Sequence, residues 1–397
     1  MLDILMSSSA DVGQIIVTLI KDFIMTSTIA EGVLVKIANS LTEMLQKLLL
    51  HPQPDKGQLK LLLPLLCQVH LKSSPHIPSN VINLKLLYHV CKLFTRSYSE
   101  DIEVQFHALN YLNLTLIQAA GQTDNPVLSM VLSNNHLFTL LEDWSKLDCL
   151  PGYLSTTLTT IALLVHLFHK HKTQVDYRIA FDVQYLVSLV SGKHTALVQA
   201  SALHLWSVVL STKFSSNFVT FKLGSERSLL SDRDVNLAIP TRHLQQLYIL
   251  AQNVIVVQDN EVLQCHAVSC LCHLLMYSKQ DHNFRNHLVH QPWNVRLLEL
   301  SLDWCVHKNT LPLSALYLLY TFFFQLHAFP GISNTMKLNY REKILSMLEE
   351  VTARESTLPT LYIDNVMLPS FLSHDTVWYD DIKTTADKLT SLLRLDD

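Results

Sequence analysis

One short pattern recurs along this chain and limits what it can fold into more than any other feature. Each copy has an aliphatic residue, then usually Gln, then one intervening residue, then His or Ser, Ala and a second aliphatic residue. The copies are VQFHAL (104–109), VQASAL (198–203), LQCHAV (263–268) and LPLSAL (311–316). Further apolar residues follow one turn and two turns on, at the 3.6-residue period of a helix. The pattern therefore predicts a set of equivalent packing helices.

The small residue at the centre of each copy sets the spacing of the repeat. We call these central Ala residues anchors. They are Ala108, Ala162, Ala202, Ala267 and Ala315, and the copy centred on Ala162 matches the pattern less well than the others. Their separations are 54, 40, 65 and 48 residues, and armadillo and HEAT repeats have periods of about 40–47 residues. An Ala side chain also lets a neighbouring helix approach closely. We therefore expect an all-α fold, an armadillo/HEAT-like α-solenoid superhelix.

The composition agrees with a helical protein that buries much of its surface. Hydrophobic residues make up 49% of the 397 residues and charged residues 16%, so disorder over most of the chain is excluded. Only 8 Gly are present, too few for sheets joined by tight turns. The formal net charge of −4 gives no general attraction to nucleic acid or anionic lipid. Seven Cys, most of them within apolar helical patterns, indicate reduced thiols in an intracellular protein.

The chain divides by pattern into three parts. Residues 1–79 are expected to form N-terminal helices, and residues 80–356 the armadillo/HEAT-like repeats. A polar stretch at 213–240 interrupts the helical patterns and is predicted to be a loop insertion. Removing roughly 20 of its residues would bring the longest anchor spacing back to the period of the other repeats. Residues 357–397 form a tail with prolines that break it.

Several local features are also predicted. Residues 31–50, 177–191, 241–257 and 339–356 have the apolar spacing of helices, and Pro330-Gly331 is predicted to be a break between helices. Asp259 is predicted to cap the helix that carries Ala267, because Asp is a favourable residue at that position.

Catalytic and metal-binding motifs were sought and not found. The sequence contains no Gly-rich phosphate loop, no nucleophile elbow, no HExxH and no paired CxxC. His166 and His169 share a helix face, but the next position on that face is Lys170, a poor ligand. The Cys and His residues between 265 and 273 point in scattered directions on a helix. We therefore expect a non-enzymatic protein with no catalytic residue, no cofactor and no metal site.

The tail offers a candidate site for binding a protein partner. Apolar residues lie between Pro359 and Pro369 and shortly after them. The candidate contact residues are Leu361, Tyr362, Val366 and Phe371. They either pack back onto the last repeat as a cap or form an apolar docking surface. Protein partners are expected at this tail or in a groove between stacked repeats.

Two other classes of function stay open. A solenoid surface could bind DNA directly through local basic patches, such as the stretch 169–172. Residues 311–329 are apolar over a length that could cross a membrane, which would make the protein a membrane-associated helical adaptor. Gln325 and His327 interrupt this stretch and it matches the repeat pattern, so a buried repeat helix is expected instead and no membrane partner.

The Ala-centred helices VQFHALNYLNLTLIQAA (104–120), VQASALHLWSVVLS (198–211) and LQCHAVSCLCHLLMYS (263–278) resemble armadillo and HEAT-type repeats. More narrowly, their His-, Cys- and Leu-rich character is similar to the meiosis inhibitor protein family, in its C-terminal portion. The resemblance implies an armadillo-like factor needed for meiotic double-strand break formation and chromosome synapsis. Such a factor acts in the nucleus through protein partners, and no catalytic residue carries over. The helical apolar opening of the chain indicates a short isoform or a fragment whose first repeats are missing.

Overall fold

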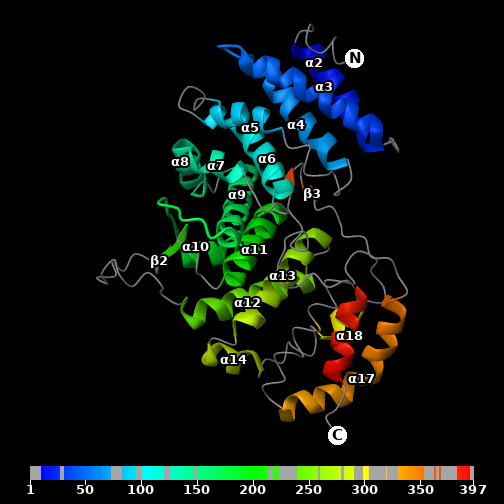
Figure 1. Ribbon diagram of the computed structural model, residues 1–397. Coiled ribbons are helices and arrows are strands. Elements are labelled where there is room, and N and C mark those ends of the chain that lie inside the picture. The colour runs from blue at the N-terminus through cyan, green and yellow to red at the C-terminus, as the bar shows by residue number, and fades with distance from the viewer. Residues whose placement is uncertain are drawn as a thin grey trace. The chain divides into compact units, whose positions relative to one another are not determined.

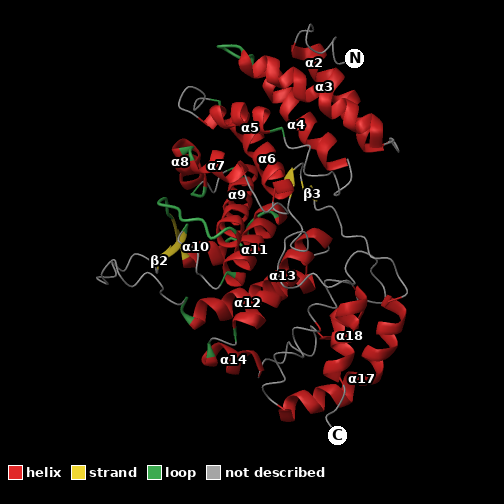
Figure 2. Cartoon of the chain, viewed as in Figure 1, coloured by secondary structure: helices red, strands yellow, loops and turns green. Residues whose placement is uncertain are grey.

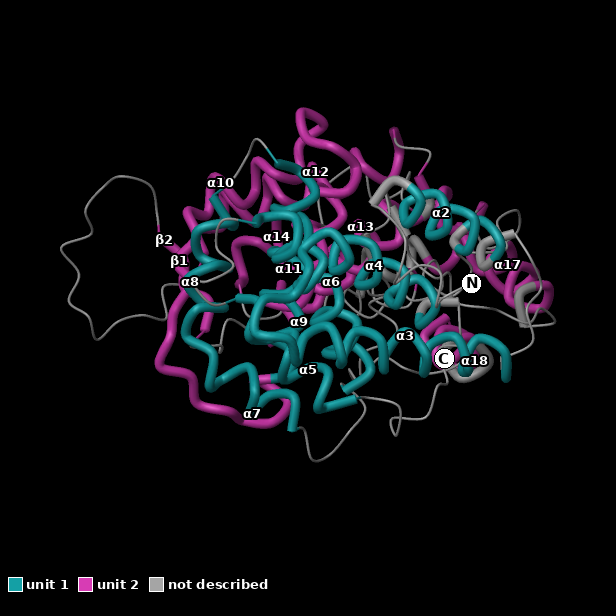
Figure 3. Tube along the Cα trace, turned by 90° about the horizontal axis from the view of Figure 1, so that it is seen from above, with its two compact units in different colours: residues 1–167 teal, residues 168–397 magenta. Residues whose placement is uncertain are grey.

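The computed structural model of the protein is mostly helical, as expected for an all-α protein (Figures 1 and 2). The described residues are 10–26, 31–72, 83–94, 101–119, 126–146, 150–212, 218–222, 239–257, 260–278, 281–289, 298–303, 319, 330–352, 362–363, 366–367 and 382–393. The chain forms two compact units, Met1–Leu167 and Phe168–Asp397, drawn in separate colours in Figure 3. The divisions expected at 79/80 and 356/357 stay predictions.

The described part of unit 1 consists mainly of helices. Its elements are α2 (Ala10–Thr26), α3 (Glu31–Leu50), α4 (Lys56–Lys72), α5 (Leu84–Cys91), a 3-10 turn η2 (Lys92–Phe94), α6 (Ile102–Ala119), α7 (Pro126–Leu132), α8 (Asn135–Trp144) and most of α9 (Pro151–Lys170). Helix α4 packs on three others, α2, α3 and α6. Its buried Leu59, Leu62, Leu63 and Leu66 fill that contact.

The described part of unit 2 contains helices and two very small sheets. Its elements are β1 (Ile179–Asp182), α10 (Val183–Ser188), α11 (Ala196–Ser211), β2 (Val219–Lys222), α12 (Thr241–Val257), α13 (Glu261–Tyr277), α14 (His282–Val289), α17 (Pro330–Thr352), β3 (Tyr362–Ile363), β4 (Val366–Met367) and α18 (Ile382–Leu393). The most extensive contact between described elements joins α11 and α13, with α12 packed on α13 (Figure 1).

The three described helices with the recurring pattern begin in the same way. A side-chain oxygen caps each helix and accepts a hydrogen bond from the backbone N–H of the aliphatic residue three positions later. The pairs are Asp101 with Val104 (3.2 Å), Thr195 with Val198 (3.5 Å) and Asn260 with Leu263 (3.0 Å). The prediction that Asp259 caps α13 is therefore wrong, because Asn260 has the three-residue spacing that the cap requires.

The Gln of the pattern has a structural role in two copies. Gln199 Nε2 donates to the carbonyl oxygen of His194 at 2.7 Å, and Gln264 Nε2 donates to that of Ile255 at 3.2 Å. Each amide thus forms a hydrogen bond between its helix and the backbone that precedes the helix. The anchors Ala108, Ala162, Ala202 and Ala267 are all fully buried. The fourth copy, Ala315 and the candidate span at 311–329 lie outside the described residues, apart from the buried Leu319.

The prediction of a helix over 177–191 is wrong in its first part. Residues Ile179–Asp182 form β1, which pairs in parallel with β2 from Ile179↔Val219 to Asp182↔Lys222. Helix α10 occupies only Val183–Ser188. Strand β2 lies within the predicted loop insertion 213–240, so that stretch is not entirely a loop. Both strands contain β-branched and aromatic residues, which favour extended structure once a partner strand is present.

Pro330 and Gly331, predicted to form a break between helices, lie in the first turn of a helix. Helix α17 begins at Pro330 and runs to Thr352, so the helix expected at 339–356 starts earlier. Pro is favourable at the first position of a helix because its missing N–H has no intrahelical partner there.

A buried polar ladder joins α6 and α9 in unit 1. Asn113 Nδ2 donates to the carbonyl oxygen of Thr156 at 3.3 Å, and the hydroxyl of Thr160 donates to Asn113 Oδ1 at 2.7 Å. The hydroxyl of Thr156 donates to Asn110 Oδ1 at 3.2 Å. Because buried polar groups must be paired, these bonds fix the register of the two helices.

Among the described helices, α9 alone is long and apolar enough to cross a membrane, by length and composition. Most of its length is buried inside the structure. A core helix satisfies the same two criteria, so this single helix is weak support for a membrane span.

Candidate interaction sites

The predicted partner-binding residues of the tail fall partly on a small hairpin. Tyr362 lies in β3 and Val366 in β4, and the strands pair antiparallel with Tyr362 opposite Met367 and Ile363 opposite Val366. The pairing therefore places the backbones of Tyr362 and Val366 in neighbouring strands. Leu361 and Phe371 lie outside the described residues.

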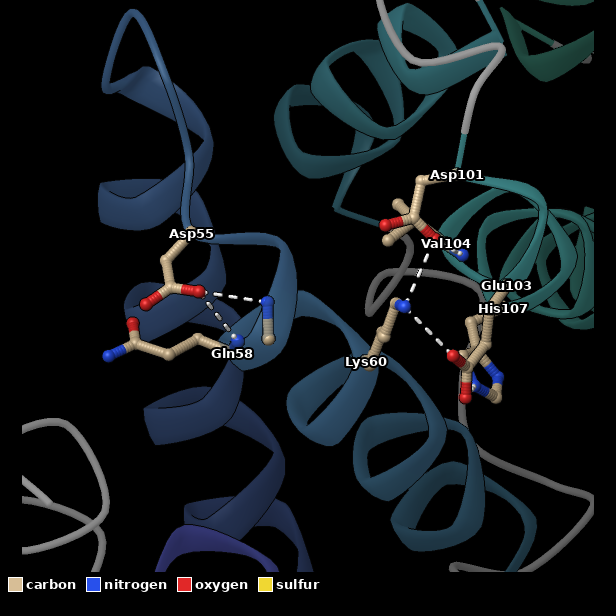
Figure 4. A network of polar contacts seen from close by, with 8 residues as sticks. Asp55, Gln58, Lys60, Asp101, Glu103, Val104 and His107 are labelled. Atoms are coloured by element: carbon tan, nitrogen blue, oxygen red, sulfur yellow. Dashed lines mark hydrogen bonds and ion pairs between the residues drawn. The ribbon is translucent and has the colours of Figure 1, made fainter. Parts of the chain in front are cut away.

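A second candidate is a charged network in unit 1 that the sequence did not reveal. Lys60 Nζ on α4 lies 3.2 Å from Asp101 Oδ1 and 2.9 Å from Glu103 Oε2 at the start of α6 (Figure 4). The same Asp101 oxygen caps α6. The hydrogen bond that Lys60 donates to Glu103 is the main cause that raises the pKa of Lys60, and the bond to Asp101 adds to it. The two ion pairs thus join α4 to α6, and both carboxylates favour the charged form of Lys60.

His107 extends this network along α6. Its Nε2 lies 4.0 Å from Glu103 Oε1, one helical turn away. Burial lowers the pKa of His107, and the opposing attraction of Glu103 is smaller. The imidazole is therefore neutral at pH 7, and Lys60, Asp101 and Glu103 together carry one net negative charge.

Aromatic rings lie beside these charges. Phe106 contacts Tyr153 with ring centroids 4.8 Å apart, and Tyr153 contacts Trp144 edge-on at 5.0 Å. Burial raises the pKa of Tyr153, and the charge of Glu103 adds to the effect. The Glu103 side chain is 53% exposed. An exposed carboxylate beside aromatic rings can hold a basic side chain of another molecule by charge and by cation–π contact.

The His residues of α13 have separate surroundings in the structure. His266 on α13 and His204 on α11 meet edge to face inside unit 2, with ring centroids 5.4 Å apart. His273 Nδ1 contacts the carbonyl oxygen of Ser269 at 2.9 Å. Among the described residues, no three His, Cys, Asp or Glu side chains are grouped to hold a metal ion. His166, from the other candidate set, is buried in α9, whereas His169 is exposed.

The described cysteines are poor candidates for reactive groups. Cys67, Cys91, Cys265, Cys270 and Cys272 are all buried. Burial raises the pKa of Cys67 and of Cys91 to about 12 and also raises that of Cys270. Their thiols are therefore protonated at pH 7, and thiolate is the nucleophilic form.

Replacing His266 with Leu is expected to stabilise the protein and to flatten its response to acid. Neither ring nitrogen of His266 has a hydrogen-bond partner among the described residues, and burial lowers its pKa to about 4 from 6.5. Between these values the unfolded chain binds the extra proton, so the free energy of unfolding falls as the pH is lowered. Removing the imidazole should raise that free energy by about 1 kcal/mol at pH 7, and by more at pH 5.

Urea denaturation from pH 7 to pH 4.5 measures this effect. Ser269→Ala is the matched control, because it removes a buried hydroxyl of the same helix that does not titrate in this range. A pH profile of His266→Leu that parallels the unsubstituted protein would contradict the prediction.

The described structure thus defines a mostly helical protein in which three helices that carry the recurring pattern have the same capped start. No family model matches the chain. Over 319 residues it is 28% identical to Meiosis inhibitor protein 1 of Homo sapiens, covering 76% of this chain and 25% of that protein. This similarity supports a distant relationship to the meiosis inhibitor family and is compatible with a meiotic role. The chain spans about a quarter of the length of the curated relative it matches.

Proposed function

We propose that this protein is a non-enzymatic helical-repeat scaffold that binds protein partners during meiosis, in double-strand break formation and chromosome synapsis. The observation that carries the proposal is its 28% identity with Meiosis inhibitor protein 1 over most of the chain. The shared starts of α6, α11 and α13 support the repeat architecture, because each copy places its cap, aliphatic residue and Ala at the same spacing. Such a factor would act in the nucleus.

The burial of α11 bears on where a partner would bind. Every side chain from Leu197 to Leu210 is buried, including those of Gln199, Ser201 and His204. This helix therefore offers no side chains to a groove between repeats. The exposed Glu103 is a better placed candidate, and the paired tail strands β3 and β4 carry two of the predicted contact residues.

Affinity purification from meiotic germ cells tests the partner-binding role. The tagged protein is compared with a variant lacking residues 357–397 and with one in which Leu361, Tyr362, Val366 and Phe371 are replaced by Ser. We expect both changes to lose at least one partner that the full chain retains. Replacing the polar tail residues Ser370 and His374 with Ala is the matched control. If every partner stays bound to both variants, the docking role of the tail is wrong.

Depletion of the protein in meiotic cells tests the process. We expect fewer recombinase foci, which mark double-strand breaks, and incomplete synapsis at the following stage. Re-expression of the full chain should restore both, and the tail variant should not. Normal numbers of foci and normal synapsis after depletion would refute the meiotic role.

Titration with duplex DNA separates a protein scaffold from a nucleic-acid-binding solenoid. A net charge of −4 favours weak binding. We expect no steep loss of affinity between about 50 and 200 mM salt, since steep loss is the signature of many phosphate contacts. Tight binding with that salt dependence would favour the DNA-binding function.

A further inference from the structure

Gly152 is a helical glycine whose backbone does not explain its presence. It is the second residue of α9, and Ala is normally more stable than Gly in a helix. Its φ angle lies outside the positive range that favours glycine. Among the described atoms, a Cβ built at this position would meet only the ring of Phe106, at 3.8 and 3.9 Å, which is ordinary van der Waals contact. A side chain would therefore fit here, and without one the edge of the Phe106 ring is uncovered at this point.

Phe106 belongs to a partly exposed group of aromatic rings. Tyr153, the residue after Gly152, contacts it with ring centroids 4.8 Å apart and planes 54° apart. The ring of His107 contacts Phe106 as well, with centroids 5.3 Å apart. Phe106, Gly152 and Tyr153 are all half-buried, so part of this group faces solvent. Aromatic faces carry partial negative charge and attract cations.

Glu103 adds a full negative charge beside these rings. It precedes Phe106 by three residues and so lies on the same face of α6. Its Oε2 is 2.9 Å from Lys60 Nζ, whereas its Oε1 is 4.0 Å from His107 Nε2, beyond hydrogen-bond distance (Figure 4). Burial and, next, the charge of Glu103 raise the pKa of Tyr153, which places the carboxylate near that phenol. The half-exposed carboxylate can therefore accept a hydrogen bond at Oε1 while it keeps its pairing with Lys60.

The charge balance of the network favours one further cation. Burial lowers the pKa of His107, so its ring is neutral at pH 7. Lys60, Asp101 and Glu103 then carry one net negative charge. A single positive group at Oε1 of Glu103 neutralises the network, whereas a carboxylate or a phosphate would be repelled. The site thus selects its ligand by the sign of its charge.

We propose that Glu103, Phe106 and Tyr153 bind an arginine side chain presented by a protein partner. The proposal rests on the scaffold function proposed above and specifies the chemistry of the partner. A guanidinium group is planar, so it can donate to the carboxylate and lie against a ring at the same time, and Gly152 leaves room for its edge. The ammonium group of lysine is compact and more strongly hydrated. Arginine is also enriched among the residues that dominate the energy of protein interfaces.

Saturation-transfer NMR of the full-length chain with the peptide acetyl-Gly-Arg-Gly-amide tests this proposal. We expect binding in the millimolar range, because one charge-assisted hydrogen bond and one cation–π contact support no more. The same peptide with citrulline in place of arginine keeps the shape and loses the charge, so it should bind about tenfold more weakly. The lysine peptide should also bind more weakly than the arginine peptide. If either substitute binds as well as the arginine peptide, the proposal is overturned.

Two variants locate the binding at this site. Glu103→Gln removes the charge and should weaken binding of the arginine peptide about tenfold. Gly152→Met fills the space beside Phe106 and should also abolish most of the binding. It should cause no loss of stability in urea, since Met is a better helix former than Gly. Glu43→Gln and Gly32→Met, at exposed positions of α3, are the matched controls and should bind normally. A folded Gly152→Met variant with unchanged affinity contradicts the proposal.

Failure of the arginine site is distinguishable from failure of the scaffold function. If the peptide experiments fail while the tail and depletion experiments succeed, the arginine site is wrong and the scaffold function stands. If the full chain retains no protein partner, the scaffold function is wrong. The peptide titrations then still decide whether the site binds arginine.

Discussion

Replacing Trp206 with Ala is expected to destabilise unit 2 by about 3–5 kcal/mol, the usual loss for a large buried aromatic side chain. Trp206 is fully buried in α11. Its ring stacks on Phe221 of β2 with centroids 5.7 Å apart and planes 11° apart, and its Nε1 donates to the carbonyl oxygen of Leu186 in α10 at 3.4 Å. One side chain thus connects three elements, and its removal leaves a cavity between them.

Hydrogen exchange read by mass spectrometry locates the effect of Trp206→Ala. Peptides from α10, α11 and β2 should lose protection, whereas peptides from α3 and α4 in unit 1 should not. Trp206→Phe is the control, because it keeps a ring against Phe221 and loses only the hydrogen bond and part of the volume. If the Trp206→Ala and Trp206→Phe variants have equal free energies of unfolding, the loss of stability does not come from a cavity.

Replacing Ala267 with Leu is expected to cost about 1–3 kcal/mol through overpacking. Ala267 is fully buried on α13, which makes its most extensive described contact with α11. Three added heavy atoms would have to displace α11 or force side chains from their preferred rotamers. The result would show that the Ala anchor permits close helix approach, which is the reason given for its recurrence.

Urea denaturation measures this change, with Asn253→Leu on α12 as the control. Asn253 is exposed, so the same added apolar bulk should change the free energy of unfolding by no more than about 0.5 kcal/mol. Equal effects at the two positions would show that close packing at Ala267 is not what the small residue provides.

Local periodicity predicted the long helices well. The segments 31–50 and 241–257 have the predicted bounds in the structure. Each carries an apolar stripe at helical spacing, which is a local signal that does not depend on residues far away in the sequence. The strands β1 and β2 were missed for the opposite reason. Each is four residues long and extended because the other lies beside it, 40 positions away, and no local pattern records that pairing.

The candidate sites likewise differ in how far local sequence could predict them. The tail residues were chosen from an apolar run, and only the backbone pairing of Tyr362 and Val366 is described. The network around Lys60 could not be predicted, since it depends on the packing of α4 on α6. Its one local signal was Asp101, which precedes an apolar helix by the spacing of an N-cap. Asn260 has the same N-cap spacing, but the sequence-based prediction placed that cap one residue earlier, at Asp259.

The pairing of β1 with β2 has a consequence for the order in which the chain acquires its structure. During synthesis, β1 leaves the ribosome about 40 residues before the strand that it pairs with, so it must wait unpaired until Lys222 has followed. Unit 1 lies wholly upstream of this point and can fold first. The stacked ring of Phe221 arrives after α11 has already emerged, which makes Trp206 an apolar group that the nascent chain must keep covered in the meantime.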